Sequence, residues 1–150
     1  MEFVHEVTAY LENKPGRLAK ICAALAHEKI NIQALAVMEH AERSVLRLVT
    51  GDAAETRRVL TSIGTESEEG EVLAMELDNR PGALAKVLEA LAEDHVNVEY
   101  AYVAAGAAQG KCLGIFHTSN PKKAHKLLTE RLTSANGEAR GGDRRPLHAR

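Results

Sequence analysis

The sequence has few aromatic residues and little excess charge. Its 150 residues include no tryptophan, three tyrosines and two phenylalanines, and the formal net charge is -2. Charges of both signs are interspersed and leave no broad basic face, so nucleic acid is not an expected partner. No apolar run approaches the roughly 18 residues that a membrane-spanning helix needs, and no signal peptide precedes Phe3. We therefore expect a soluble cytoplasmic protein with no membrane partner.

Cysteine is scarce as well. Cys22 and Cys112 lie inside apolar segments, so we interpret them as buried reduced thiols rather than as a disulfide framework. The seven histidines show neither an HxxxH spacing nor a usable pairing with cysteine, and we expect no metal site. No nucleophile elbow, P-loop or Rossmann glycine pattern occurs. We therefore expect no catalytic residues and no cofactor.

What the sequence does contain is an internal repeat. LENKPGRLAK at residues 11–20 returns as LDNRPGALAK at residues 77–86, which places Pro81 66 positions (81 − 15) after Pro15. At this offset, with no gap, the residues between 11 and 36 that are identical in both copies are Leu11, Asn13, Pro15, Gly16, Leu18, Ala19, Lys20, Ala24, Leu25, Ala26 and Asn31. The chain is therefore a tandem duplication.

Each copy alternates strand and helix patterns. Residues 3–11 alternate in polarity with a period near two, which predicts a half-buried strand. The apolar residues of 18–26 fall at i, i+3, i+4, i+7 and i+8, which predicts an amphipathic helix. Two strands should follow, to about Met38 and over 44–50, and then a second helix. Asp52 and Asn120 are the expected N-caps of the second helices.

The junction between the copies predicts a shared strand. Residues 65–71 continue into the apolar segment 72–77 without a proline or a long glycine-rich break. We predict an α+β fold of two tandem ferredoxin-like βαββαβ units, with antiparallel sheets and helices on one face. The predicted boundaries are residues 1–70, residues 71–133 and a disordered tail at 134–150. The fourth strand of repeat 2 should be short, displaced or missing, because Leu147 is the only large apolar residue after position 132.

The repeated loop, with the sequence Asn-x-Pro-Gly-x-Leu followed by a helix and by Val/Ile-Asn-Val/Ile, resembles the ACT domain. The resemblance covers residues 3 to about 132 and is strongest in 13–32 and 79–98. It implies a stand-alone, non-catalytic regulatory protein that binds an amino acid or a similar small metabolite at the interface of its repeats. It also implies a homodimer and a possible partner enzyme, although a fold alone does not fix a function.

The loop itself offers a physical basis for such binding. Glycine lets a ligand approach the backbone closely, and free N–H groups at the start of the next helix favour a carboxylate. The asparagines add amide donors and acceptors, and in the family's pattern the strand asparagine faces the same ligand. The ligand-binding residues that we expect are Asn13, Pro15, Gly16, Arg17, Leu18 and Asn31 in repeat 1, and Asn79, Pro81, Gly82, Ala83, Leu84 and Asn97 in repeat 2.

Three questions about ligand binding stay open at this point. Serine-sensing members of the family carry a histidine two places before the loop asparagine, where this chain has Leu11 and Leu77, so serine is not favoured. Repeat 2 places Tyr100 and Tyr102 after its second asparagine, which predicts a more polar or aromatic pocket there and allows binding by one copy alone. Finally, the chain could be a regulatory subunit that pairs with an enzyme and binds no ligand, in which case the turns are purely structural.

Overall fold

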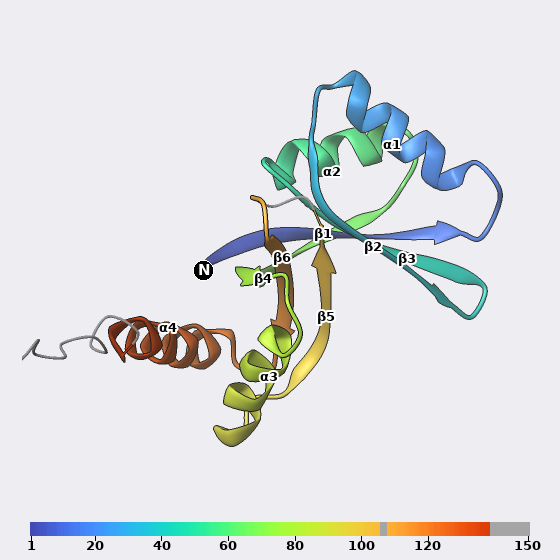
Figure 1. Cartoon of the computed structure of the whole chain (residues 1–150). Helices are drawn as coiled ribbons and strands as arrows, with labels where there is room; N and C mark the ends of the chain where they lie inside the picture. The colour runs from blue at the N-terminus through green and yellow to red at the C-terminus, as the bar shows by residue number, and fades with distance from the viewer. Residues whose placement is uncertain (106–107, 139–150) are drawn as a thin grey trace, which may run out of the picture.

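The computed structural model describes residues 1–105 and 108–138. Figure 1 shows four helices and the strands of one sheet. In chain order the elements are β1 (Glu2–Glu12), α1 (Arg17–His27), β2 (Ile32–His40), β3 (Arg43–Thr50), α2 (Ala53–Ser62), β4 (Ser67–Asp78), α3 (Ala83–Glu93), β5 (Val98–Ala104), β6 (Lys111–Thr118) and α4 (Pro121–Glu138).

A single antiparallel sheet runs through both repeats, in the order β2-β3-β1-β4-β6-β5. Its central pair is β1 with β4, in which His5 lies opposite Glu71. These two positions are equivalent in the repeats (71 − 5 = 66), so an approximate twofold axis passes between them. The first half of β4 pairs with β1 and the second half with β6. The predicted continuous strand at the junction is confirmed.

Repeat 2 has no fourth strand of its own within residues 108–138. The start of β1 takes that place, because Glu2–Val4 pair with residues 72–74 of β4. Helix α4 continues to Glu138, so residues 134–138, which were predicted as tail, are helical. The remainder of the predicted tail, residues 139–150, lies outside the described residues.

The helices pack on one face of the sheet over two separate cores. In repeat 1, α1 and α2 bury Leu25 and Leu60 against Leu48 of β3. In repeat 2, α3 and α4 bury their apolar side chains, such as Leu91, against Phe116 of β6. Figure 1 shows the α1–α2 and α3–α4 pairs over opposite halves of the sheet. Because each fully buried aliphatic or aromatic side chain contributes about 1.5–3 kcal/mol, both helix pairs are fixed by their apolar faces.

The opposite face of the sheet curls inward. The outermost strands, β2 and β5, approach until their Cα atoms lie within 8 Å. A third core fills the space between the two halves, with buried side chains from β2, β3, β4 and β6: Ala34, Val49, Val72, Ala74 and Ile115. Within the described residues, the contact between the repeats is therefore packed with apolar side chains.

A polar cluster closes this inner face around Glu6, whose exposed fraction is 2%. The hydroxyls of Tyr100 and Tyr102 each donate to one of its carboxylate oxygens at 2.6 Å. Arg47 Nη1 donates to the same carboxylate at 3.3 Å, and its guanidinium lies 3.6 Å from the centre of the Tyr100 ring. Since Glu6 and Arg47 belong to repeat 1 and the tyrosines to repeat 2, the cluster ties the repeats together. The two tyrosines therefore satisfy a buried carboxylate, which would be costly without partners.

Replacing Tyr102 by phenylalanine should destabilise the fold. The change removes one donor to the buried Glu6 carboxylate and keeps the ring, so we expect a loss of about 1.5–3 kcal/mol in the free energy of unfolding in urea. Tyr10→Phe is the matched control. Because Tyr10 is 43% exposed, the loss of its hydroxyl should hardly change the free energy of unfolding. Equal effects of the two substitutions would contradict the role given to the cluster.

The stability gap between the wild type and Tyr102→Phe should depend on pH. Burial, and then the hydrogen bond to Glu6, raise the pKa of the Tyr102 hydroxyl. A group whose pKa is raised by folding stabilises the protein below its unfolded pKa, about 10 for tyrosine, and loses that contribution as the pH rises through the folded value. Urea titrations should show the gap intact at neutral pH and shrinking above about pH 10. A gap that stays constant across this range would refute the assignment.

Candidate functional site

The residues predicted from the sequence centre on two copies of one turn. After β1, the Lys14 N–H donates to the Glu12 carbonyl at 2.9 Å, and Gly16 adopts φ 85° before α1 begins. After β4 the turn is repeated with Gly82 at φ 84°. An L side chain is strained at such angles, so both helix starts depend on glycine.

Helices α1 and α3 also begin without a side-chain cap. No side chain within the described residues accepts a hydrogen bond from their first turns. By contrast, Asp52 Oδ1 accepts from the Glu55 N–H at 2.9 Å in α2, and Asn120 Oδ1 accepts from the Lys123 N–H at 3.0 Å in α4. Uncapped N–H groups and the helix dipole both favour an anion at the start of α1 and of α3.

The loop and strand asparagines do not meet within a repeat. Strands β1 and β2 run in the same direction, because each is antiparallel to β3. Asn13 follows the end of β1 and Asn31 precedes the start of β2, so the 11 residues of α1, about 16 Å of helix, separate them. Asn79 and Asn97 are separated in the same way in repeat 2. One copy of the chain therefore does not assemble the expected pairs of asparagines.

The other predicted residues lie in the turns and the first helical turns, at the surface. Leu18 and Ala83 are half-buried, and the exposed ones are Asn13, Pro15, Gly16, Arg17, Asn79, Pro81, Gly82 and Leu84. The two turns lie far apart, since each follows the far end of one strand of the antiparallel β1–β4 pair. A small ligand therefore cannot contact both turns of one chain.

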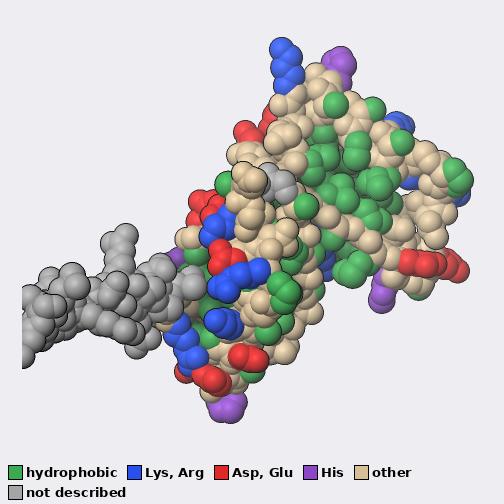
Figure 2. Space-filling view, viewed as in Figure 1, with side chains coloured by type: hydrophobic (Ala, Val, Ile, Leu, Met, Phe, Trp, Pro, Cys, Tyr) green, Lys and Arg blue, Asp and Glu red, His purple; other side chains and the backbone are tan. Residues whose placement is uncertain are grey.

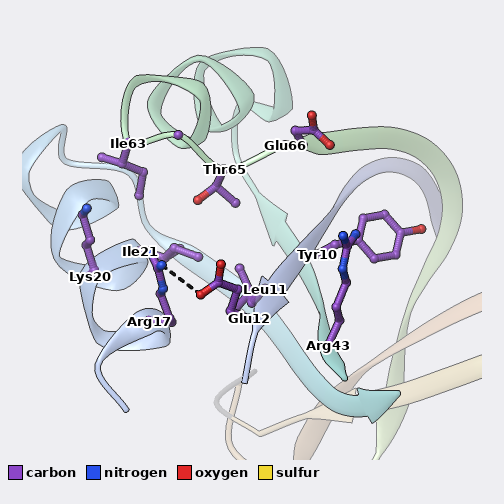
Figure 3. Close-up of a pocket in the computed structure, with 11 residues that line it drawn as sticks. Tyr10, Leu11, Glu12, Arg17, Lys20, Ile21, Arg43, Ile63, Thr65 and Glu66 are labelled. Carbon is purple, nitrogen blue, oxygen red and sulfur yellow. Dashed lines mark hydrogen bonds and ion pairs between the residues drawn. The ribbon is translucent and has the colours of Figure 1, made fainter. Parts of the chain in front are cut away.

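A pocket of about 270 Å³ opens beside the first turn (Figure 3). Its walls come from the end of β1, the start of α1 and the loop 63–66 that follows α2. Arg17, one of the predicted residues, lines it and donates to Glu12 at 3.2 Å. Hydrogen bonds from Lys14 and then Arg17 hold the pKa of Glu12 below its usual value. Lys20 and Arg43 add two further cations to the lining.

A second pocket, of about 540 Å³, lies at the equivalent place in repeat 2. Ala83, another predicted residue, lines it. Seven residues of its lining stand 66 positions after lining residues of the first pocket: Glu76, Leu77, Asp78, Ala83, Lys86, Val87 and Arg131 follow Tyr10, Leu11, Glu12, Arg17, Lys20, Ile21 and Thr65. The duplication has therefore kept a pocket together with the turn. The pocket lysines, Lys20 and Lys86, were not among the residues predicted from the sequence. Both copies carry lysine at this position, and that repetition was a signal that could have found them.

A family model for the ACT domain pair matches residues 2–138, a range that contains both turns and both pockets. The chain belongs to the ACT domain pair family. The match confirms the predicted resemblance and the two tandem ferredoxin-like units.

Several solved structures share the fold. The ACT pair is 32% identical to protein BT0572 from Bacteroides thetaiotaomicron, with 86% of this chain and 88% of that chain covered and a TM-score of 0.79. The regulatory subunit of aspartate kinase from Thermus thermophilus is 15% identical over 87% of this chain and 97% of that chain, with a TM-score of 0.63. The corresponding subunit from Thermus flavus is 18% identical over 86% of this chain and 93% of that chain, with a TM-score of 0.59. No curated protein matches the chain.

The described parts of the ACT pair offer no metal site and no membrane-spanning helix. Residues 1–105 and 108–138 contain no cluster of His, Cys, Asp and Glu side chains suited to a metal ion. Nor does this part of the chain contain a helix with the length and apolar character to cross a membrane. The turns and their adjoining pockets are therefore the candidate functional site.

Gly16→Ala and Gly82→Ala should each lower the free energy of unfolding by about 1–2 kcal/mol, because alanine is strained at a left-handed φ. The added Cβ would meet nothing within 4 Å at either position, so the cost is conformational. Gly70→Ala is a matched control: its Cβ would also meet open space, and its φ is not positive. Chemical denaturation of the three variants measures the difference. A Gly70→Ala variant as unstable as the other two would contradict this account.

Proposed function

We propose that this ACT pair is a non-catalytic regulatory protein that binds an amino acid, or a similar small carboxylate metabolite, at its Asn-x-Pro-Gly turns. One observation carries the proposal: both turns keep the same glycine conformation and an uncapped helix start. The second helices of the repeats, in contrast, exchanged one side-chain cap for another, Asp52 for Asn120. The left-handed φ requires glycine at both positions, and the first turns of α1 and α3 therefore stay without a side-chain cap.

The chemistry of the turn suits an amino-acid backbone. The free N–H groups of the first helical turn can donate to a carboxylate, and the glycine beside them allows close approach. The amide of Asn13 or Asn79 offers an acceptor for an ammonium group and a donor for a second carboxylate oxygen. Each repeat supplies one such half-site.

A second copy of the chain would complete the half-site in repeat 1. Asn31 lies at the opposite end of α1 from Asn13, so a twofold pairing that sets two α1 helices antiparallel brings Asn13 of one copy toward Asn31 of the other. The unpaired edge of β2 favours this pairing, because it exposes Leu35, Val37 and Met38. Hydrophobic side chains gather over this half of the molecule (Figure 2). We therefore propose a homodimer with the ligand at the interface between copies.

Repeat 2 carries an equivalent edge, in which α3 and β5 expose Leu84, Leu88 and Val103. These exposed side chains support a second candidate function, in which a partner enzyme covers the edges and the turns bind no ligand. The fold is shared with regulatory subunits of aspartate kinase, which makes a role as a separate regulatory subunit a reasonable alternative. In both versions the protein acts in the cytoplasm and passes its output to another protein.

Thermal unfolding against all twenty amino acids at millimolar concentration tests the proposal. A ligand at 100 times its Kd adds about 2.7 kcal/mol and raises the unfolding midpoint by several degrees. We expect a shift confined to one chemical group of amino acids. It should be reduced in Asn13→Ala or Asn79→Ala and kept in Lys122→Ala, which shortens an exposed side chain of α4.

Two outcomes would count against this function. A flat panel would favour the interaction module, and the next experiment would then be sedimentation of the protein with candidate partner enzymes. A shift that neither asparagine variant changes would show that a ligand binds elsewhere and that the turns are structural.

A further inference from the structure

The pocket of repeat 2, here called the α3–α4 pocket, is larger than the equivalent pocket of repeat 1. The cause lies in the path of the chain after the second helix of each repeat. In repeat 1, α2 ends at Ser62, and Gly64 at φ 76° turns the chain back, so that Ile63 and Thr65 cover the smaller pocket. In repeat 2, α4 continues in helical form to Glu138, and no returning loop within the described residues closes the pocket. Ala83 also stands where Arg17 fills part of the smaller pocket.

The floor of the α3–α4 pocket is apolar. It is formed by Leu77, Val87, Ala90 and Leu128, all of which belong to the core of repeat 2. The pocket, with a volume of about 540 Å³, reaches these side chains, each of which is at most 6% exposed. Small-molecule pockets are typically of about 300–1,000 Å³, with mostly apolar walls and a few polar groups that orient the ligand. The space suits a compact apolar group.

The rim carries an excess of positive charge. Arg80 and Lys111 share one carboxylate, that of Asp78, at 3.2 and 2.6 Å. Lys86 also lines the pocket, and within the described residues its ammonium group has neither a hydrogen-bond nor an ion-pair partner. Glu76 is the other acidic residue of the lining. An anion beside Lys86 would therefore meet a cation without a partner in this part of the chain, and Arg80, which shares Asp78 with Lys111, lies on the same rim.

We propose that the α3–α4 pocket binds a small organic anion with a compact apolar body and one carboxylate. The body would lie on Val87 and Leu128, and the carboxylate would pair with Lys86 and Arg80. The pocket adjoins the second turn, to which Arg80 belongs, and the proposal goes beyond the function above because its ligand is held without the loop asparagines. The first pocket has half this volume, and Arg17 stands there in the place of Ala83, so the proposal is made for repeat 2 alone.

The test uses 4-methylpentanoate as the probe and follows the methyl NMR signals of Val87 and Leu128 in the full chain. We expect these signals to shift and saturate. 4-Methylpentan-1-ol keeps the apolar body without the charge, and inorganic phosphate keeps the charge without the body, so each should bind about tenfold more weakly or worse. Absence of saturable shifts with 4-methylpentanoate, or equal binding of the alcohol, would overturn the proposal.

Two charge reversals locate the carboxylate. Lys86→Glu should weaken binding of 4-methylpentanoate by about fivefold or more. Lys20→Glu, at the equivalent helical position of repeat 1, should leave it unchanged. Asn79→Ala should also leave it unchanged, which separates this site from the turn. Equal effects of Lys86→Glu and Lys20→Glu would mean that the probe responds to net charge rather than to the pocket, and would overturn the assignment.

Discussion

The antiparallel pairing of β1 with β4 holds the molecule together. A unit of about 65 residues buries only roughly 60% of the surface of its unfolded chain, so each repeat alone would be marginal. Pairing β1 with β4 joins the two small sheets into one and removes an exposed strand edge from each. The start of β1 also replaces the strand that repeat 2 lacks, so neither ferredoxin-like unit is complete without the other.

The closure of the inner face breaks the symmetry of this arrangement. On one side Glu6 is held by the two tyrosine hydroxyls and Arg47. The positions that the repeat makes equivalent to Glu6, Tyr100 and Tyr102 are apolar: Val72, Ala34 and Ala36. Although the two repeats descend from one sequence, the contact between them is therefore polar on one side of the twofold axis and apolar on the other. The two Asn-x-Pro-Gly turns lie away from this contact, at opposite ends of the β1–β4 pair.

The sequence predicted the features that depend on neighbouring residues. The glycine turns, the caps at Asp52 and Asn120 and the strand that crosses the repeat boundary all follow from local pattern, and the structure contains them. The burial of Glu6 could not be predicted in this way. In an alternating strand it reads as an outward polar residue, and its partners Tyr100 and Tyr102 come from a strand more than 90 positions later.

The candidate site shows the same limit. The turns were found from their repeated motif, but the spacing of Asn13 and Asn31 gave no sign that parallel strands place them at opposite ends of a helix. The pockets depend on where α2 and α4 end. The low apolar content of residues 133–150 favoured a tail from position 134, yet α4 continues through residues 134–138, and no loop within the described residues covers the second pocket.

Nuclear Overhauser effects across the inner face test this account most directly. If Glu6 joins the repeats, ring protons of Tyr100 and Tyr102 should show cross-peaks to the side-chain protons of Glu6 and Arg47 in the native protein. Absence of these cross-peaks in a sample that retains those between β1 and β4 would mean that the sheet is open. The inner face would then be accessible to ligands, and the closed contact between the repeats would be wrong.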